Sequence, residues 1–297
     1  MMPNFLILGA AKSGTTALYH YLKQHPQVYL SPIKETEFFA FEGEELNFQG
    51  PKDLPRLSIT TLEDYQAQFD SVEDEIAIGE ASPVYLYSSK APERIYNYLP
   101  DAKLIVILRN PVERAYSQFL MFIRDGREPL QDFMQAVDEE DTRIAKNWAW
   151  GWHYLRLGLY HQQLKRYVER YPQKQIKVYL YEELKSNSDG MLKDILNFLE
   201  VDNTFIPNTS VKHNISGIPQ NKLIQSWLYE KNIIKKVVKP FLPQKLRKEI
   251  FIKLKNQQKL HKPELSSEVR QQLLPFFRED ILELQELIGK DLSGWLV

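Results

Sequence analysis

The chain has 297 residues, of which 43% are hydrophobic and 26% charged, ordinary proportions for a soluble globular enzyme. Its 38 basic and 39 acidic side chains nearly cancel, so no overall field favours nucleic acid as a partner. It has no cysteine, which excludes disulfides and a thiol nucleophile and disfavours a zinc site. The apolar run from Phe5 to Ala11 is too short to span a bilayer and lacks a signal peptide's basic flank. We therefore expect a soluble, cytoplasmic protein.

Short runs of β-branched and aromatic residues alternate with segments of helical periodicity along the first two thirds of the chain. Several of the short runs are apolar throughout, as strands covered on both faces are. The alternation predicts an α/β fold, a P-loop-like parallel sheet flanked by helices with right-handed crossovers. Strands are expected over 4–8, 28–30, 76–79, 104–108 and 176–180, and helices near 14–25, 90–99, 112–125, 159–170 and 189–199.

The stretch 43–62 carries Gly50, Pro51 and Pro55 and is typical of an inserted loop. Thr60 and Glu63 have the spacing of a capping box, which predicts a helix running to Phe69. Beyond about residue 207 the strand signals stop and helical ones replace them.

A glycine-rich turn follows the first strand, with the sequence Gly9-Ala-Ala-Lys-Ser-Gly-Thr-Thr16. Between a strand and a helix, such a turn directs backbone N–H groups at an anion, and the helix dipole adds partial positive charge. A nucleotide-kinase loop needs a lysine directly after the second glycine, but Thr15 stands there and Lys12 lies inside the turn. The pattern predicts an anion site unlike that of a Mg-ATP enzyme, with a plain turn and a chance lysine as the alternative.

A second strand-to-helix junction begins at Arg109, and Pro111 suits the first turn of its helix. Ser117 follows Arg109 by eight residues, about two helical turns, and faces the same junction. Such an arginine can clamp a phosphate, although arginines at strand ends commonly form structural ion pairs. Two anion sites at one sheet edge together predict a nucleotide with two separated anionic groups.

These segments resemble motifs of sulfotransferases that use 3′-phosphoadenosine-5′-phosphosulfate (PAPS). The segment 12–16 looks like their 5′-phosphosulfate loop, 108–117 resembles their 3′-phosphate motif, and 181–184 is similar to the segment whose tyrosine lies beside the adenine. The resemblance covers residues 4 to about 200, and 289–295 resembles a common bacterial family ending. It implies PAPS as cofactor, 3′-phosphoadenosine-5′-phosphate (PAP) as product and no required metal. The implied nucleotide contacts are Lys12, Ser13, Gly14, Thr15, Thr16, Arg109, Ser117 and Tyr181.

A loop rich in Gly and Pro at 212–219 lies where the family closes over the nucleotide. This likeness adds Lys212, Ser216 and Gly217 to the expected cofactor contacts, although the loop does not reproduce the Arg-Lys-Gly sequence of the cytosolic branch. The resemblance therefore divides the chain into a single domain with a PAPS-binding core at 1–206 and a covering loop and helical segment at 207–297.

The family divides by catalytic base, a histidine in one branch and a glutamate in the heparan sulfate N- and 3-O-sulfotransferase branch. The segment 78–85 resembles the glutamate branch through Glu80 and Tyr85, while Ala81 replaces its usual lysine. The resemblance implies in-line displacement with Glu80 as general base and Lys12 stabilising the departing phosphate. Partial burial would raise the pKa of Glu80, and the alternative is a structural carboxylate paired with a nearby cation.

Four residues are candidates for acceptor contacts. Lys34 lies in a segment similar to one that borders the family's active site, although a solvated loop lysine fits equally well. Trp150 and Trp152 could stack on a sugar, but packing in the core is the commoner role of such rings. His153 is the second candidate for proton transfer.

The stretch 231–262 is rich in Lys and Arg and contains one acid, Glu249. Leu246, Ile250 and Leu254 recur at helical spacing and predict an amphipathic basic helix. Such a helix could contact an anionic acceptor, an acyl carrier protein or a membrane surface, or present a solvated face.

The sequence thus predicts a PAPS-dependent sulfotransferase acting on a hydroxyl or amine of a glycan, lipid, acyl chain or specialised metabolite. One alternative is a P-loop-type nucleotide kinase, which would need the missing lysine and a Mg-binding acid. The other is a non-catalytic nucleotide- or glycan-binding module on the same fold.

Overall fold

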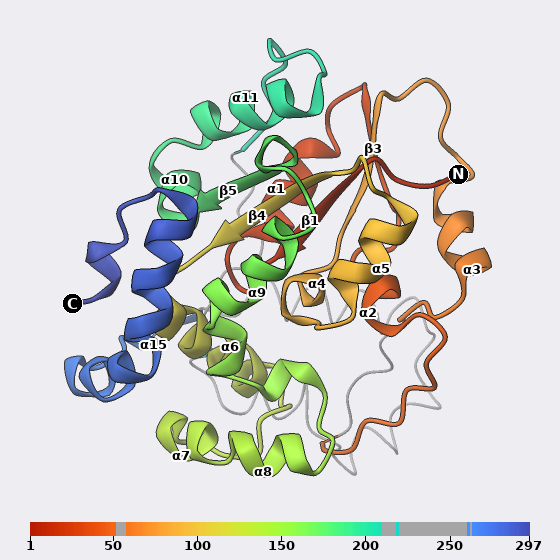
Figure 1. Cartoon of the computed structure of the whole chain (residues 1–297). Coiled ribbons are helices and arrows are strands. Elements are labelled where there is room, and N and C mark those ends of the chain that lie inside the picture. The colour runs from red at the N-terminus through yellow and green to blue at the C-terminus, as the bar shows by residue number, and fades with distance from the viewer. Residues whose placement is uncertain (52–57, 210–217, 220–259, 262) are drawn as a thin grey trace, which may run out of the picture.

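A parallel sheet of five strands forms the centre of the computed structural model, which describes residues 1–51, 58–209, 218–219, 260–261 and 263–297 (Figure 1). The strand order is β2-β3-β1-β4-β5, and all four pairings are parallel. The chain leaves β1 toward one edge and later returns to β4 on the other side of β1. The strands are β1 (Phe5–Gly9), β2 (Val28–Leu30), β3 (Ala77–Ala81), β4 (Lys103–Leu108) and β5 (Ile176–Leu180).

All five expected strands are present, and the bounds of 28–30 and 176–180 are those predicted. The main difference is β3, which continues through Glu80, whereas the prediction ended that strand at Gly79. A charged residue can lie in this buried strand because hydroxyl groups surround its carboxylate.

Helices cover both faces of the sheet, as the alternation of strands and helices predicts (Figure 1). The helices are α1 (Thr15–Leu22), α2 (Phe38–Phe41), α3 (Leu62–Gln66), α4 (Val84–Tyr87), α5 (Ala91–Tyr98), α6 (Pro111–Arg124), α7 (Phe133–Asp138), α8 (Glu140–Ala145), α9 (Tyr160–Val168), α10 (Tyr181–Ser186), α11 (Ser188–Leu199) and α15 (Ser267–Ile288). Short 3-10 turns are η1 (Ala67–Phe69), η2 (Trp150–Trp152), η3 (Arg156–Gly158), η4 (Gln173–Gln175) and η5 (Ser293–Trp295).

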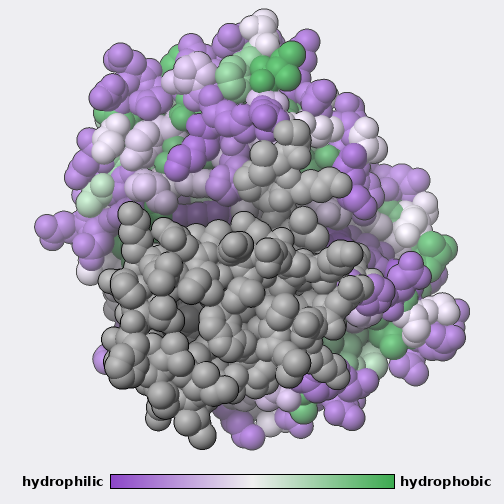
Figure 2. Space-filling model, turned by 180° about the vertical axis from the view of Figure 1, so that it is seen from behind, coloured by the Kyte–Doolittle hydropathy of each residue, from purple (hydrophilic) through white to green (hydrophobic). Residues whose placement is uncertain are grey.

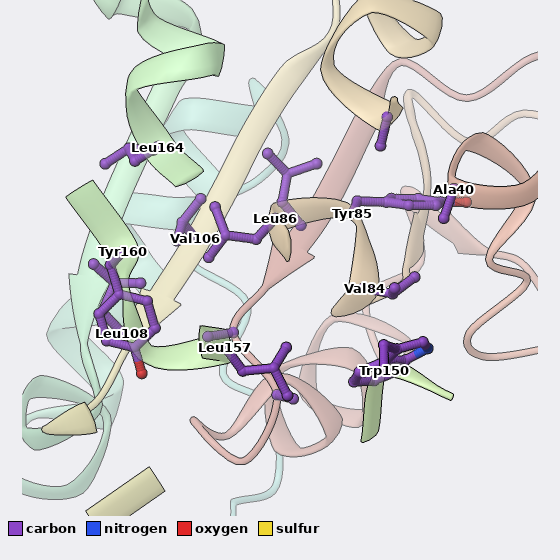
Figure 3. Close-up of a cluster of buried hydrophobic side chains, with 14 of the residues drawn as sticks. Ala40, Val84, Tyr85, Leu86, Val106, Leu108, Trp150, Leu157, Tyr160 and Leu164 are labelled. Atoms are coloured by element: carbon purple, nitrogen blue, oxygen red, sulfur yellow. The ribbon is translucent and has the colours of Figure 1, made fainter. Parts of the chain in front are cut away.

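Alternate residues of each central strand face two separate hydrophobic clusters. Phe5 and Ile7 of β1 pack with α1 and α11, while Leu6 and Leu8 pack on the opposite face with α4, α6 and α9. Figure 3 shows the second cluster, where Val106 of β4 lies among side chains of α4 and α9. This two-sided burial explains why the strands lack the polar alternation of a half-exposed sheet.

The expected capping box is displaced by one residue. Thr61, not Thr60, begins α3, and its Oγ1 accepts a hydrogen bond from the Asp64 backbone N–H over 3.2 Å. Thr60 is held in the preceding loop, where its carbonyl accepts from the Gly43 N–H over 2.8 Å. Both threonines precede an acid by three residues, so spacing alone could not choose between them.

The C-terminal part contains a two-residue antiparallel ladder between β6 (Ile218–Pro219) and β7 (Leu260–His261). The expectation that strands end near residue 207 was therefore wrong, because pairings this short leave no periodic signal. The predicted contacts Lys212, Ser216 and Gly217 and most of the basic stretch 231–262 lie outside the described residues.

From behind, the visible described surface is mainly hydrophilic, with hydrophobic residues scattered over it (Figure 2). Within the part of the chain that the structure describes, no helix is both long and apolar enough to cross a bilayer.

Candidate active site

The carboxyl ends of β1 and β4 are adjacent at the point where the strand order reverses. In open parallel sheets, ligands bind in the crevice outside the strand ends at such a point. The predicted Lys12 turn follows β1, and the predicted Arg109 junction follows β4. The two motifs that the sequence singled out therefore meet at one location.

The turn after β1 requires a glycine at position 14. Gly14 has φ of 99° and precedes α1, and a Cβ there would come within 2.5 Å of Leu184 Cδ2. The same Cβ would also contact the ring of Tyr181, so the turn is packed against the start of α10. Ser13 and Thr15 are buried and Thr16 is half-buried, so the turn is packed into the protein at the N-terminus of α1.

Lys12 is a partly buried cation with weak compensation. Its Nζ lies 3.1 Å from Met121 Sδ on α6. Burial and the charge of Arg124 lower the pKa of Lys12 to about 8, although Asp125 and Glu35 oppose part of the shift. A bound anion would therefore stabilise the charged form of Lys12.

Arg109 is buried beside the same turn. Its Nη1 donates to the Lys12 carbonyl over 3.3 Å, and its Nη2 donates to Glu113 Oε2 over 3.1 Å. The guanidinium lies 4.9 Å from the centre of the Tyr181 ring. Ser117 is also buried, two turns along α6. The structure therefore brings together Lys12, Arg109 and Tyr181 from three separate junctions.

Glu80 is 0% exposed, and each of its carboxylate oxygens accepts two hydroxyl hydrogen bonds. Oε1 accepts from Tyr65 over 3.0 Å and from Tyr85, and Oε2 accepts from Thr36 over 2.7 Å and Ser82 over 2.9 Å. Burial raises the pKa of Glu80, and the four hydroxyl groups oppose that shift. The expectation of partial burial was wrong, and hydroxyl groups stand where the alternative placed a cation.

A second carboxylate, Glu35, lies in the loop that follows β2. Its side chain is 38% exposed and forms an ion pair with Lys34. Its negative charge raises the pKa of Lys12, so the two groups interact. The backbone N–H of Glu35 donates to the Ala81 carbonyl over 3.0 Å, which places its loop beside the end of β3. The signal that could have found Glu35 was its position next to Lys34, in the loop between β2 and α2.

The profile of the sulfotransferase domain family matches residues 2–285 of the chain. The chain belongs to this family. A sulfotransferase structure from Alicyclobacillus acidocaldarius resembles it over 99% of both chains, with 33% sequence identity and a TM-score of 0.78. The family and the fold predicted from the Lys12 and Arg109 motifs are therefore confirmed.

Curated relatives of this sulfotransferase include enzymes with different names and lengths. The membrane-associated sulfotransferase kil1 of Dictyostelium discoideum is 25% identical, and the match covers 76% of this chain and 62% of kil1. Heparan sulfate glucosamine 3-O-sulfotransferase 6 of Mus musculus is 29% identical, over 66% of this chain and 52% of the relative. The bifunctional heparan sulfate N-deacetylase/N-sulfotransferase of Drosophila melanogaster is 27% identical, and the match covers 67% of this chain and 20% of the relative. The chain thus spans less than two thirds of each of these relatives.

In this sulfotransferase, the Glu80 cluster holds the loop that carries Lys34 and Glu35. Thr36 links the loop to Glu80, and the Glu37 backbone N–H donates to Ser82 Oγ over 3.1 Å. The Phe39 N–H donates to the Tyr85 hydroxyl over 3.4 Å. Buried hydrogen bonds of this kind fix a loop because leaving any partner unsatisfied is costly.

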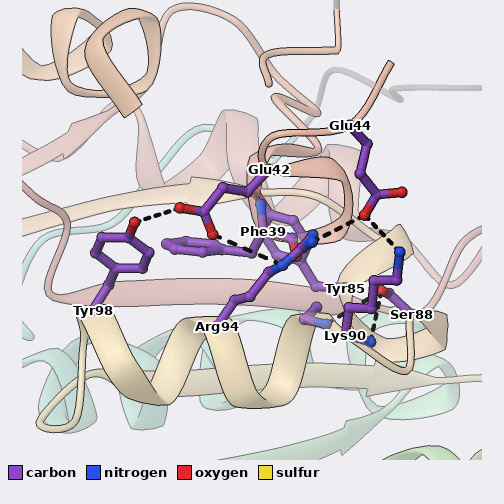
Figure 4. A network of polar contacts seen from close by, with 9 residues as sticks. Phe39, Glu42, Glu44, Tyr85, Ser88, Lys90, Arg94 and Tyr98 are labelled. Carbon is purple, nitrogen blue, oxygen red and sulfur yellow. Dashed lines mark hydrogen bonds and ion pairs between the residues drawn. The ribbon is translucent and has the colours of Figure 1, made fainter. Parts of the chain in front are cut away.

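Ion pairs fix the next stretch of the same segment, after α2. Figure 4 shows Arg94 of α5 between Glu42 and Glu44, with Nη2 lying 3.0 Å from Glu44. Lys90 also contacts Glu44 over 2.9 Å, and the Tyr98 hydroxyl donates to Glu42. The segment 34–44 is therefore held at both ends.

The predicted aromatic acceptor contacts are mostly enclosed. Trp152 is 1% exposed and packs 4.8 Å from Phe122 and 5.5 Å from Trp148, between ring centres. Trp150 is also buried, so core packing, the alternative reading of these rings, is what the structure has. Neighbouring side chains cover the ring of Trp152, so packing, the commoner role of such rings, describes it better than stacking on a sugar.

His153 is paired away from the Lys12 turn. Its Nδ1 lies 2.7 Å from the Tyr87 hydroxyl, and burial lowers its pKa to about 4. It is therefore neutral at physiological pH. Over the ranges that the structure describes, no three His, Asp or Glu side chains form a group that could hold a metal ion.

Proposed function

We propose that this sulfotransferase transfers a sulfuryl group from PAPS to a hydroxyl or amine of an acceptor. The observation that carries the proposal is the hydrogen bond from Arg109 to the Lys12 carbonyl, which places two cationic side chains at one sheet edge. PAPS carries two separated anionic groups, the 3′-phosphate and the 5′-phosphosulfate. Two adjacent cationic sites at a strand-order reversal suit such a nucleotide.

Each part of the nucleotide is assigned to a separate group of residues. The turn 9–16 and Lys12 would hold the 5′-phosphosulfate through backbone N–H groups and the ammonium. Arg109 and Ser117 would hold the 3′-phosphate, and Tyr181 would lie against the adenine, since its ring already stacks near Arg109. The contacts predicted for Lys212, Ser216 and Gly217 remain part of the proposal.

The reaction is an in-line displacement at sulfur. The acceptor oxygen or nitrogen forms a bond to sulfur while the bond from sulfur to the phosphate oxygen breaks, and PAP leaves. Negative charge develops on the departing phosphate, where Lys12 can stabilise it. The acceptor proton passes to a carboxylate, and no metal is required because Lys12 and the turn supply positive charge.

We assign the general base to Glu35 in place of Glu80. A base must come within hydrogen-bond reach of the acceptor, and Glu80 is enclosed with four hydroxyl donors. Glu35 is partly exposed, interacts with Lys12 and lies in the loop that the Glu80 cluster holds. Asp125 also interacts with Lys12, but it caps the C-terminal end of α6 and lies outside the loop that the Glu80 cluster holds.

Glu80 then has a positioning role in this proposal. Its hydrogen bond to Thr36 holds the residue that follows Glu35. Lys34, which the sequence suggested as an acceptor contact, lies in the same loop and would contact the sulfuryl group or the acceptor. Loss of Glu80 would therefore reduce transfer by displacing Glu35 and Lys34.

The test is acceptor-dependent release of PAP. The protein is incubated with ³⁵S-labelled PAPS and separate pools of glycans, lipids, acyl chains on carrier protein and small metabolites. We expect one pool to become labelled and PAP to accumulate with it. PAPS binding without label transfer to any pool would favour the non-catalytic module, and transfer of label from γ-³²P-labelled ATP in a parallel incubation would favour the kinase. A cytoplasmic location remains a prediction, which fractionation of cells tests separately.

A further inference from the structure

We propose that Arg270, on the C-terminal helix α15, is a positioning residue for the 3′-phosphate site. It neutralises Glu113, and the neutralised Glu113 in turn orients Arg109 toward the phosphate. This inference rests on the proposed function, because it assumes that Arg109 meets the 3′-phosphate of PAPS or PAP.

Glu113 lies between two guanidinium groups from distant parts of the chain. Its Oε2 accepts from Arg109 Nη2 over 3.1 Å, and its Oε1 accepts from Arg270 Nη2. Arg109 and Arg270 are separated by most of the sequence, yet one carboxylate joins them. Because each oxygen of Glu113 has its own arginine, the position of Arg109 depends on both contacts.

The charge balance gives Arg270 its role. Arg109 and Glu113 alone would form a nearly neutral pair, and a 3′-phosphate would meet the negative charge of Glu113 beside the arginine. With Arg270 added, the three side chains carry one formal net positive charge. A phosphate would then approach three side chains with a net positive charge, and it would contact Arg109 directly.

Packing of α15 fixes Arg270 in this place. Phe277, seven residues later on the same helix face, is fully buried. A Cβ placed on Gly158 would lie 2.8 Å from Phe277 Cε1 and 2.8 Å from Pro111 Cβ. Phe277 of α15 therefore packs against the first turn of α6. Asn110 Nδ2 also donates to the Trp295 carbonyl over 3.4 Å.

The same C-terminal segment contacts the proposed adenine side. Lys290 Nζ lies 2.9 and 2.8 Å from the two carboxylate oxygens of Glu183, and Glu183 Oε2 accepts from the Leu180 N–H at the start of α10. The segment 263–297 therefore supports both junctions that carry nucleotide contacts. A simple supporting role would affect the adenine and phosphate ends together, whereas the proposed role of Arg270 is confined to the 3′-phosphate.

The test compares two ligands that differ in the 3′-phosphate, PAP and adenosine 5′-monophosphate (AMP), by calorimetry at low salt. Arg270→Ala should weaken PAP binding about 3- to 10-fold, the range for loss of one partly exposed charge pair. AMP binding should stay unchanged. Arg270→Lys should keep most of the PAP affinity, and adding Glu113→Gln to Arg270→Ala should restore it. Arg278→Ala, which removes an exposed arginine of the same helix, is the matched control.

Equal losses for PAP and AMP in Arg270→Ala would overturn the proposal in favour of simple support. Unchanged PAP binding in Arg270→Ala, with a clear loss in Arg109→Ala, would also overturn it and leave the proposed function standing. Unchanged PAP binding in Arg109→Ala would contradict the 3′-phosphate site itself, and both would fall. If Arg270→Ala does not fold, the comparison of Arg270→Lys with Arg270→Gln decides on the same criteria.

Discussion

Thr36 Oγ1 donates a hydrogen bond to Glu80 Oε2 over 2.7 Å, and it does so from the loop that carries Lys34 and Glu35. The two residues come from different parts of the chain, β3 and the segment after β2, and both are completely buried. Because Thr36 directly follows Glu35, this one bond couples the enclosed carboxylate to the partly exposed one. The distinct roles of the two carboxylates can be separated by mutation.

Glu80→Gln should lower both stability and turnover. Glutamine preserves the shape, but its NH2 group cannot accept from the hydroxyl groups that donate to the carboxylate, and leaving buried donors unpaired typically costs about 1–3 kcal/mol of unfolding free energy. PAP affinity should barely change, since the cluster faces the 34–39 loop. Thermal unfolding and calorimetry on one preparation measure this. A variant with parental stability and turnover reduced about 10²–10⁴-fold would instead make Glu80 the base.

The pH dependence of stability tests the buried state of Glu80 independently. Burial raises its pKa in the folded protein above the unfolded value, so the folded state binds the proton more tightly. Stability contributed by this group is therefore present below the unfolded pKa and falls as pH rises through the window between the two values. Glu80→Gln should lack that component, and the difference between the two stability profiles would show it. Parallel profiles over the acid range would contradict the raised pKa.

Glu35→Gln should abolish proton transfer with little effect on folding. Its side chain is partly exposed and forms an ion pair with Lys34, and exposed pairs contribute little, so the loss of stability should be small. Single-turnover transfer should fall about 10²–10⁴-fold, while PAP binding is retained. Glu45→Gln, an exposed acid in the same part of the chain, is the control. Undiminished transfer in Glu35→Gln would remove Glu35 from the mechanism.

The nucleotide affinity should depend on the protonation of Lys12. Because burial lowers the pKa of Lys12 to about 8, the free protein loses this charge as pH rises through that value. PAP affinity should fall about fivefold between pH 8 and pH 9, as the protonated fraction does. Lys12→Arg, which stays charged, should show a flat profile over the same range. A flat profile in the parent would mean that Lys12 does not contact the anion.

PAP and PAPS should bind without a divalent cation. The turn at 9–16 supplies backbone N–H groups and Lys12 supplies the charge that a metal provides in nucleotide kinases. Titration of PAP in EDTA, compared with titration in magnesium, measures this directly. Binding that disappears on chelation would require a metal at the phosphate and would revive the kinase reading.

The fold could be predicted from the sequence because the patterns that indicate its strands and turns each lie within a short segment. The apolar runs of β4 and β5 and the Gly14 turn each lie within a few residues, and the structure has them where the periodicity indicated. Candidate site residues could be proposed from the sequence only where a motif is contiguous, as at Lys12 and Arg109. The enclosure of Glu80 depends on Tyr65 and Thr36, which lie in other segments, so no spacing could predict it.

The same limit applies to contacts over longer separations. Glu113 and Arg270 are 157 residues apart, and only the packing of α15 on α6 brings them together. The sequence does not distinguish Glu35 from Glu80 as the base, because Glu80 stands in the segment that resembles a catalytic motif. The interaction of Glu35 with Lys12 depends on tertiary structure, because the Glu35 loop is bonded to the end of β3 and β3 pairs with β1.

The most direct measurement of the central proposal is single-turnover transfer of the ³⁵S-labelled sulfuryl group from PAPS, comparing the parent with Lys12→Met. Methionine fills a similar volume without the ammonium that should stabilise the departing phosphate. We expect label transfer in the parent, and a rate about 10²–10³-fold lower in Lys12→Met at saturating PAPS, with the variant still folded. Transfer at the parental rate in Lys12→Met would contradict the proposed site and mechanism.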